Sequence, residues 1–411
     1  MADVSVLKVQ LYGEDIGTLT LVQGSRTVFT FDQTYIENSN RPTLSLSFQD
    51  KFGGLLDEVS PTNLKVPPFF SNLLPEGPMR EYLAKQAGVN EKREFFLLWV
   101  LGQDLPGAVT IKAAGGDTLP PDLESEIVAA REKRRRDVMR FSLPGVQLKF
   151  SALLNFQKAG GFVIPAEGTG GSWIVKLPSQ RFDGVPENEF SMMSLARRLG
   201  MDVPEVKLVE PEDIEGLPER IGDLKGPALA VARFDRSDAG PIHIEDFAQV
   251  FGAWPEQKYE RGKALSIARV LGGVAEPASS AEFVRRLVFN TLIGNADMHL
   301  KNWSLIYPDR CHAALAPAYD FLSTVPYIKD EEAAIRYART KKMAQLSFDE
   351  LRYLAAKAQI SESLVINAAE ETVERFLDAW PAAKKDLPIT GNVVSAIEEH
   401  MSRLLILRPN S

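Results

Sequence analysis

The stretch NTLIGNADMHLKNWSLIY, residues 290–307, decides how the fold and chemistry of this sequence are interpreted. Its two ends are apolar and are typical of segments buried in a core. Its middle instead places Asp297, His299 and Asn302 within a few residues of one another. Core packing does not explain these residue types between two apolar runs, because burying an unpaired polar side chain costs free energy. We therefore expect the apolar ends to be the packed walls of a functional loop, residues 295–302.

The composition is that of a globular protein. The chain has 411 residues, 45% hydrophobic and 25% charged, which is long enough for two or three domain-sized units. Its net charge of -8 argues against broad nonspecific binding to nucleic-acid phosphates. The single cysteine, Cys311, excludes an internal disulfide and a cysteine-based zinc site. The N-terminus lacks a signal-peptide pattern, and no window approaches the roughly 20 apolar residues of a membrane-spanning helix. We expect a soluble cytoplasmic protein that does not contact a membrane.

The hydrophobic periodicity changes along the chain. Three alternating runs predict the strands of a small β-rich unit: residues 5–13, 15–31 and 43–48. Residues 141–177 have the pattern of strands and loops. The segment PENEFSMMSLARRLG, residues 186–200, predicts a helix, because its apolar residues are spaced by three and Gly200 stands at its end. From about residue 244 onward helical patterns dominate. The order is β-rich, then mixed, then α-rich.

Common nucleotide and metal motifs are missing from the sequence. There is no G-x-x-x-x-G-K-[ST] and no H-E-x-x-H, and GTGGSW (168–173) lacks the third glycine of G-x-G-x-x-G. What remains is the logic of phosphoryl transfer. Protein kinases place a catalytic Asp and a metal-binding Asn in one loop as D-x-x-x-x-N, since the Asp faces the attacking hydroxyl and the Asn faces Mg²⁺ on the phosphates. Asp297 and Asn302 have this spacing.

This spacing is common by chance, so its value depends on the other parts of a kinase site. Lys176 ends the predicted strand WIVK, where kinases place the lysine that holds the ATP phosphates. Either Glu187 or Glu189, at the start of the next helix, would orient that lysine. Asp320 follows an apolar run and is placed to be a second metal ligand. SLPGVQLK, residues 142–149, is a candidate for the loop over the phosphates. The parts follow one another in the order found in kinases.

With these parts identified, the sequence resembles the HipA-like serine/threonine kinases, the toxin components of bacterial toxin–antitoxin pairs. The resemblance covers nearly the whole chain. The N-terminal subdomain signatures of the family are similar to PFFSNLLPEG and LGQDLPGAVTI, and its S-x-x-G-x-Q-x-K loop to FSLPGVQLKFSALL. The remaining blocks match in order ENEF…LARRLGMDVPE, ALAVARFDR, GNADMHLKNWSL and LAPAYDFLST. Several blocks in order are far more specific than any one of them.

The resemblance implies roles for individual residues. Asp297 matches the catalytic Asp, and Asn302 and Asp320 match the Mg²⁺ ligands. The implied contacts with ATP come from the following residues: Lys176 at the phosphates, His299 near the nucleotide, Ala232 and Phe234 in the segment whose backbone contacts adenine, and Gly145 and Lys149 in the phosphate loop. Ser142 matches the loop serine that the family autophosphorylates. Many members carry Glu where Ala232 stands, a departure that matters if that side chain helps to bind adenine.

The fold implied is a bilobal protein-kinase-like α/β (α+β) fold with ATP bound between its two lobes. We expect a β-rich N-terminal subdomain (1–128), a mixed kinase N-lobe (129–236) and an all-α C-lobe (237–411). The implied activity is that of an ATP- and Mg²⁺-dependent serine/threonine protein kinase that arrests growth. Its implied target is a translation-related protein such as an aminoacyl-tRNA synthetase. Its inhibitors would be autophosphorylation and a small DNA-binding antitoxin of the HipB type, through which any contact with DNA would come.

Two other classes of protein remain open on the residues alone. A small-molecule phosphotransferase on a kinase-like fold shares the Asp…Asn…Asp arrangement, although the PFFSNLLPEG unit argues against it. A non-catalytic kinase-like binding module would need none of this chemistry, yet every required catalytic residue type is present.

Overall fold

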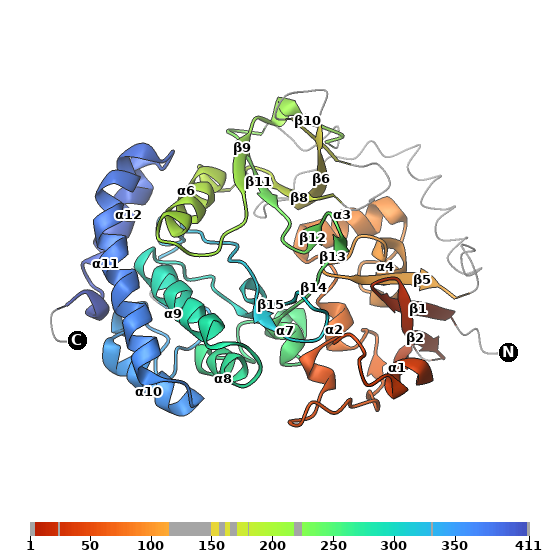
Figure 1. Cartoon of the computed structure of the whole chain (residues 1–411). Helices are drawn as coiled ribbons and strands as arrows, with labels where there is room; N and C mark the ends of the chain where they lie inside the picture. Colours follow the sequence, from red (N-terminus) through yellow and green to blue (C-terminus); the bar gives the residue numbers. More distant parts are fainter. Residues whose placement is uncertain are drawn as a thin grey trace.

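The computed structural model describes residues 5–23, 25–114, 149–155, 161–164, 171–179, 181–217, 224–329 and 332–408. These residues form an N-terminal β-rich region, a middle region with a mixed sheet, and a mainly helical C-terminal region (Figure 1). No helix among them is long and apolar enough to cross a membrane.

The N-terminal region is built on a five-stranded antiparallel sheet in the order β4-β3-β2-β1-β5. Its strands are β1 (Ser5–Leu11), β2 (Glu14–Val22), β3 (Arg26–Phe31), β4 (Thr62–Asn63) and β5 (Val109–Ala113). Its helices are α1 (Gln33–Glu37), α2 (Pro68–Ser71), α3 (Gly77–Ala87) and α4 (Glu94–Leu101). Thr27, Phe29 and Phe31 alternate on the buried face of β3, as the period-two pattern predicts. The first two predicted strand runs are thus confirmed as β1 to β3.

The third predicted strand, residues 43–48, is wrong. The segment ends in a 3₁₀ helix, η1 (Leu46–Phe48), instead of joining the sheet. Ser45 caps this turn by accepting a hydrogen bond from the N–H of Ser47 at 3.0 Å. The N–H of Leu46 donates to the buried carboxylate of Glu245 at 3.0 Å. These backbone donors therefore go to side chains and not to a neighbouring strand, a choice that alternation in the sequence does not reveal.

The middle region holds a six-stranded sheet in the order β10-β7-β6-β8-β11-β9. Its strands are β6 (Lys149–Asn155), β7 (Gly161–Val163), β8 (Trp173–Lys176), β9 (Val206–Val209), β10 (Ile214–Glu215) and β11 (Ala228–Ala232). The predicted helix is confirmed as α6 (Val185–Arg198), which packs against β9 and β11. Gly200 follows its end with φ +87°, a left-handed conformation that suits glycine after a helix.

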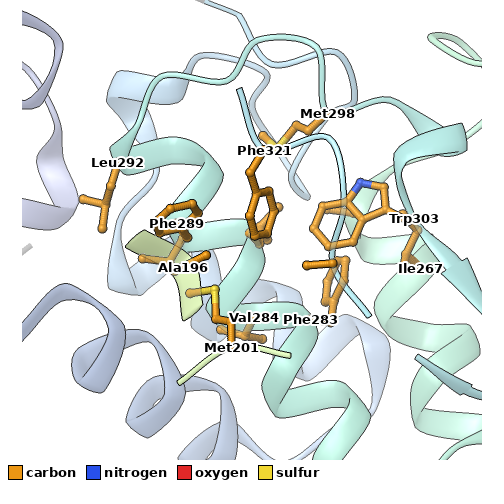
Figure 2. Close-up of a cluster of buried hydrophobic side chains, with 14 of the residues drawn as sticks. Ala196, Met201, Ile267, Phe283, Val284, Phe289, Leu292, Met298, Trp303 and Phe321 are labelled. Atoms are coloured by element: carbon orange, nitrogen blue, oxygen red, sulfur yellow. The ribbon is translucent and has the colours of Figure 1, made fainter. Parts of the chain in front are cut away.

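The C-terminal region is mainly helical. Its helices are α7 (Phe247–Val250), α8 (Ala264–Val274), α9 (Pro277–Leu292), α10 (Phe348–Ala358), α11 (Glu362–Asp386) and α12 (Gly391–Met401). The other 3₁₀ helices among the described residues are η2 (Pro211–Asp213), η3 (Pro255–Gln257), η4 (Leu300–Asn302), η5 (Met343–Gln345) and η6 (Leu405–Leu407). The hydroxyls of Ser347, Ser361 and Thr390 cap α10, α11 and α12. Figure 2 shows part of the large apolar core that these helices share, including Phe283, Phe289 and Phe321.

The expectation of an all-α C-terminal lobe needs a correction. A three-stranded antiparallel sheet lies in it, in the order β14-β15-β16: β14 (His243–Asp246), β15 (Ser304–Tyr307) and β16 (Ala314–Leu315). A short hairpin, β12 (Arg236–Ser237) with β13 (Gly240–Pro241), precedes it. All four residues of β15 are buried, so its sequence shows no alternation that would mark a strand. The loop at 295–302 leads through Trp303 into β15.

Polar contacts join the N-terminal region to the rest of the chain. Arg233 donates to Asp104 Oδ1 at 2.8 Å, and Asp235 Oδ2 accepts from the N–H of Gly107 at 2.8 Å. Glu245, on β14, reaches across the same boundary to Leu46. Because these groups are largely buried, their pairing fixes how the two regions sit against each other.

Candidate active site

The polar segment 295–302 is held between α9 and β15. Leu292 at the end of α9 and Trp303 just before β15 are both buried, and so is Met298 within the segment. Figure 2 shows these three side chains in one apolar cluster. Asp297, by contrast, is exposed. The apolar residues thus fix the segment at both ends and in its middle while the Asp297 carboxylate faces solvent, which is the arrangement expected of a functional loop.

Asp297 and Asn302 are directly joined across their five-residue spacing. The Nδ2 of Asn302 donates to the backbone oxygen of Asp297 at 2.9 Å, and the N–H of His299 donates to the same oxygen at 2.8 Å. The Asp297 carboxylate is not used in these bonds. Its Oδ1 accepts from the hydroxyl of Tyr259 at 2.9 Å. The short loop therefore carries a carboxylate and an amide in a fixed relation.

Asn295, which the sequence analysis did not single out, organises the start of the loop. Its Oδ1 accepts from the N–H of Asp297 at 3.0 Å, and its Nδ2 donates to Asn290 Oδ1 at 2.7 Å. The same Nδ2 lies 3.4 Å from the backbone oxygen of Asp320. Thr324 adds a second link, since its hydroxyl accepts from the N–H of Ala296 at 2.8 Å. Both links connect the loop to the segment that carries Asp320.

Gly294, at the junction of α9 and the loop, should be intolerant of a side chain. Its φ is +67°, and a Cβ there would lie 2.7 Å from Cγ1 of Val325. We expect Gly294→Ala to lower the free energy of unfolding by about 1–3 kcal/mol, because strain and overlap add. Urea unfolding measures this. Gly273→Ala in α8 is the matched control, because a Cβ there meets nothing within 4 Å. Equal stability of the two variants would contradict the claim that Gly294 cannot accommodate a side chain.

Three of the residues predicted to bind phosphate or metal meet in the structure: Lys176, Lys149 and Asp320. Lys176, the last residue of β8, forms ion pairs through Nζ with Glu189 Oε1 and with Asp320 Oδ1. Lys149 Nζ lies 3.4 Å from the other oxygen of Asp320. The open choice between Glu187 and Glu189 is thereby resolved in favour of Glu189. Lys176 and Glu189 are both almost fully buried, so each depends on the other for compensation of its charge.

Electrostatics in this cluster follow from one buried ammonium shared by two carboxylates. Burial lowers the pKa of Lys176, but Asp320 and Glu189 outweigh it and hold the pKa above its usual value. Burial raises the pKa of Asp320, yet Lys149 and Lys176 outweigh it and hold the pKa well below its usual range. Burial raises the pKa of Glu189, and Asp320 adds to this increase despite Lys176. The ammonium of Lys176 is thus charged, and Asp320 is ionised.

Asp320 has an unusual backbone conformation. Its φ of +56° lies in the left-handed region, which costs most residues other than glycine roughly 1–3 kcal/mol and is frequent at functional sites. The surrounding contacts maintain it, through Lys176 at the carboxylate and Asn295 at the carbonyl. The conformation directs the carboxylate toward both lysines.

His299 is buried, and its Nδ1 has no hydrogen-bond partner among the residues that the structure describes. Its ring lies edge-on to that of Tyr259, with centroids 5.1 Å apart. Burial lowers the pKa of His299 to about 4, so the imidazole is neutral at pH 7. A buried imidazole nitrogen without a partner within the protein fits the expected position beside a nucleotide.

The predicted adenine segment lies at the end of β11. The N–H groups of Ala232 and Arg233 both donate to backbone oxygens, those of Glu205 and Ser172, at 2.8 Å. Recognition of adenine by this backbone would therefore have to use other groups than these two. The ring of Phe234 lies 5.7 Å from that of Tyr319, the residue before Asp320. This contact brings the adenine segment near the Asp320 segment.

Two predicted residues of the phosphate loop, Ser142 and Gly145, lie outside the described residues. Lys149, at the end of that loop, is described and begins β6.

Asn302 and Asp320, the two predicted metal ligands, fit a metal ion bound together with nucleotide phosphates better than a metal ion held by protein alone. Within the described ranges there is no cluster of three or more His, Cys, Asp and Glu that could hold a metal ion. Asn302 and Asp320 offer oxygen ligands, and proteins usually bind Mg²⁺ through one or two carboxylates together with substrate phosphates. The Nδ2 of Asn302 is committed to Asp297, so its amide oxygen is the atom suited to a cation.

Comparison with known proteins identifies the family. Residues 141–380 match the family model of the HipA-like C-terminal domain, and residues 7–112 match that of the HipA N-terminal domain. The chain belongs to the HipA-like family. A relative from Sinorhizobium fredii, named "Putative kinase Y4dM", is 60% identical over 409 residues, 99% of each chain. The serine/threonine-protein kinase toxin HipA of Shewanella oneidensis is 29% identical over 301 residues, 65% of each chain.

A solved structure confirms the fold. A chain in the complex of the Shewanella oneidensis toxin–antitoxin system, HipA and HipB with operator DNA, superposes with a TM-score of 0.71. The two chains are 23% identical, and the match covers 97% of this chain and 96% of that one. The predicted bilobal kinase-like α/β fold of a HipA-like protein is therefore confirmed.

Proposed function

We propose that this HipA-like protein is an ATP- and Mg²⁺-dependent serine/threonine protein kinase. The observation that carries the proposal is the connection of sequence-distant groups around one site. Asp297 and Asn302 share a hydrogen-bonded loop, Asn295 links that loop to Asp320, and Asp320 pairs with Lys176. A cluster that only stabilised the fold would not require the exposed carboxylate of Asp297, the buried Lys176 and the left-handed backbone of Asp320 to be connected to one another.

The residues of the chain have distinct roles in the proposed reaction. The exposed Asp297 carboxylate would orient a serine or threonine hydroxyl and accept its proton as the oxygen bonds to the γ-phosphorus, while the bond between that phosphorus and the β,γ-bridging oxygen breaks and ADP leaves. Lys176 holds the phosphates, and its own position is fixed by Glu189. Asn302 and Asp320 would hold Mg²⁺, which when bound neutralises charge on the phosphates. Catalysis in this class is mostly positioning and electrostatic stabilisation.

The nucleotide contacts proposed are consistent with the surroundings of the site. Neutral His299 offers its Nδ1 to the nucleotide, and the segment of Ala232 and Phe234 would contact adenine. Lys149 and Gly145 belong to the loop proposed to lie over the phosphates. Lys149 Nζ lies 3.4 Å from Asp320 Oδ2, which supports a role for the end of this loop at the phosphates.

A phosphotransfer assay tests the proposal. The purified chain is incubated with radiolabelled ATP and Mg²⁺, with a cell extract as the source of protein substrates and with small-molecule acceptors in parallel. We expect label on serine or threonine of protein, lost when Mg²⁺ is chelated. Label appearing on small molecules alone would point to the phosphotransferase alternative. Absence of ATP binding and of transfer would refute a kinase function.

The biological role we propose is that of a growth-arresting toxin whose target belongs to translation, such as an aminoacyl-tRNA synthetase. A small DNA-binding antitoxin of the HipB type would neutralise it and provide its contact with DNA in the cytoplasm. Support comes from the relative named a HipA toxin and from the fold shared with a chain of a HipA, HipB and operator DNA complex. Phosphoproteomics of cells expressing the chain identifies the target.

We also propose domain boundaries at residues 128 and 236, which separate an N-terminal subdomain, a kinase N-lobe and a kinase C-lobe.

Autophosphorylation of Ser142 is the proposed off-switch. A phosphate adds a charge of about -1.5 to -2. On a loop over the ATP phosphates it would repel them, or draw the loop toward basic groups. We expect Ser142→Asp to weaken ATP binding at least tenfold, an energy of about 1.4 kcal/mol, measured by calorimetry. Ser142→Ala is the control and should bind ATP as the unmodified chain does. ATP binding by Ser142→Asp at full strength would contradict the switch.

A further inference from the structure

Glu76, in the PFFSNLLPEG segment of the N-terminal region, lies against the loop that carries Asp297. It stands at the N-cap position of α3 without making a side-chain capping bond, and its two carboxylate oxygens contact two different lysines. Oε1 lies 2.8 Å from Nζ of Lys301, the residue before Asn302 in η4. Oε2 lies 2.8 Å from Nζ of Lys258, which follows η3. The Nζ of Lys301 also donates to the backbone oxygen of Asn72 at 3.1 Å, so two groups from the N-terminal region bind this ammonium.

Both lysines belong to segments that contact Asp297 or its loop: Lys301 lies in the loop itself, and Lys258 precedes Tyr259. The backbone oxygen of Lys258 accepts from the N–H of Leu300 at 3.3 Å, which joins the 258 segment to η4. The next residue, Tyr259, donates its hydroxyl to Asp297 Oδ1 at 2.9 Å. Glu76 thus connects Lys301, which is next to Asn302, with Lys258, which is next to Tyr259, the hydrogen-bond donor of Asp297.

We propose that Glu76 is a positioning residue, through which the N-terminal region completes the proposed active site by holding Lys301 and Lys258 together. Its catalytic consequence rests on the proposed kinase function. Without Glu76 the loop would still be connected to α9 and β15, and Lys301 would keep its bond to the oxygen of Asn72, but the loop would lose its charged contacts with the N-terminal region. The N-terminal region is then part of the catalytic unit and not an independent appendage.

The charges explain why a carboxylate is needed at this position. Two ammonium groups lie within 2.8 Å of one carboxylate, so they would repel each other if it were neutral. The Lys301 side chain is 15% exposed and that of Lys258 is 17% exposed, so water screens this repulsion incompletely. Asp246 lies 4.0 Å from Lys301 and compensates it in part. Burial raises the pKa of Glu76, but Lys301 and Lys258 outweigh it and lower the pKa to about 2, which keeps the carboxylate charged.

Glu76→Gln removes the charge and keeps the shape. We expect kcat to fall about tenfold with KM for ATP changed less than about twofold, because the contact orients the loop and does not touch Lys176. Amide hydrogen exchange in residues 295–302, measured by mass spectrometry, should become roughly tenfold faster. Adding Lys258→Met to Glu76→Gln removes one of the two repelling ammonium groups and should restore part of both losses. A residue that merely docks the two regions would show no such recovery.

The matched control is Lys65→Gln. Lys65 pairs with Glu256 across the same boundary but does not touch the loop, so its removal should leave exchange in 295–302 unchanged. The inference is overturned if Glu76→Gln exchanges like the unmodified chain, or if Lys65→Gln accelerates exchange as much. The exchange measurement needs no enzymatic turnover. An unmodified chain without kinase activity would refute the proposed function while the exchange data still decide the role of Glu76.

Discussion

Replacing Asp297 by Asn is expected to reduce phosphoryl transfer by about 10²–10⁴-fold or more. The amide has the shape of the carboxylate and can still accept from Tyr259, but it cannot accept the proton of a substrate hydroxyl. Asn302 should keep its place, because it binds the backbone oxygen of Asp297 and not the side chain. Single-turnover transfer of labelled phosphate to protein measures the loss, and ATP affinity should stay within a few-fold.

Stability provides the control for this variant. Asp297 is exposed, so its free energy of unfolding should change by less than about 1 kcal/mol. Asp378→Asn, at an exposed aspartate on α11, is the matched substitution and should leave transfer intact. Near-normal turnover by Asp297→Asn would contradict the proposal that Asp297 is the catalytic residue.

Lys176→Met is expected to abolish activity and also to destabilise the fold. The Lys176 side chain is 6% exposed and that of Glu189 is 3% exposed, and Asp320 shares the same ammonium. Removing the lysine leaves the buried Glu189 carboxylate without its cation and Asp320 with Lys149 alone, and breaking such a buried pair typically costs about 3–5 kcal/mol. The ATP phosphates lose their proposed partner at the same time. Urea unfolding and calorimetric ATP binding measure the two effects separately.

A double variant separates these effects of Lys176. Lys176→Met with Glu189→Met removes both members of the buried pair and should recover much of the lost stability, because the buried Glu189 carboxylate is removed together with its cation and Asp320 keeps Lys149 as a partner. It should remain inactive. Lys207→Met is the control on β9 of the same sheet, since Lys207 pairs with Glu205 at the surface and should change stability by less than about 1 kcal/mol. A stable Lys176→Met variant that still binds ATP would contradict the assignment.

The sequence was sufficient to predict the parts of the site that depend on short spacing. Asp297 and Asn302 lie within one loop, and Lys176 ends a strand whose apolar pattern is plain. Glu189 could not be separated from Glu187 in advance, because two residues apart on a helix is about 200° of rotation, and a small shift in the helix start exchanges their faces. The pairing with Lys176 required the packing of α6 on the sheet.

Contacts between distant segments were beyond sequence reasoning. Tyr259 and Glu76 belong to no catalytic motif, and they reach the loop only because η3 and α3 pack beside it. Asn295 was overlooked for a different reason, since a buried amide that links two loops looks like any polar loop residue in the sequence. The strands β14 to β16 were missed because they are short and because β15 between them is fully buried, so that it shows no alternation. Polar residues within apolar runs, such as Glu245, were the one sequence signal that could have pointed to these buried contacts.

The most direct test of the central claim is a comparison of phosphate incorporation by the unmodified chain and its Asp297→Asn variant. Both are expressed in cells, and phosphoserine and phosphothreonine sites are quantified by mass spectrometry. We predict that sites on a small set of proteins, together with Ser142 of the chain, are phosphorylated with the unmodified chain and revert to background with the variant. Identical phosphorylation patterns in the two cultures, with both proteins folded and equally abundant, would contradict the account.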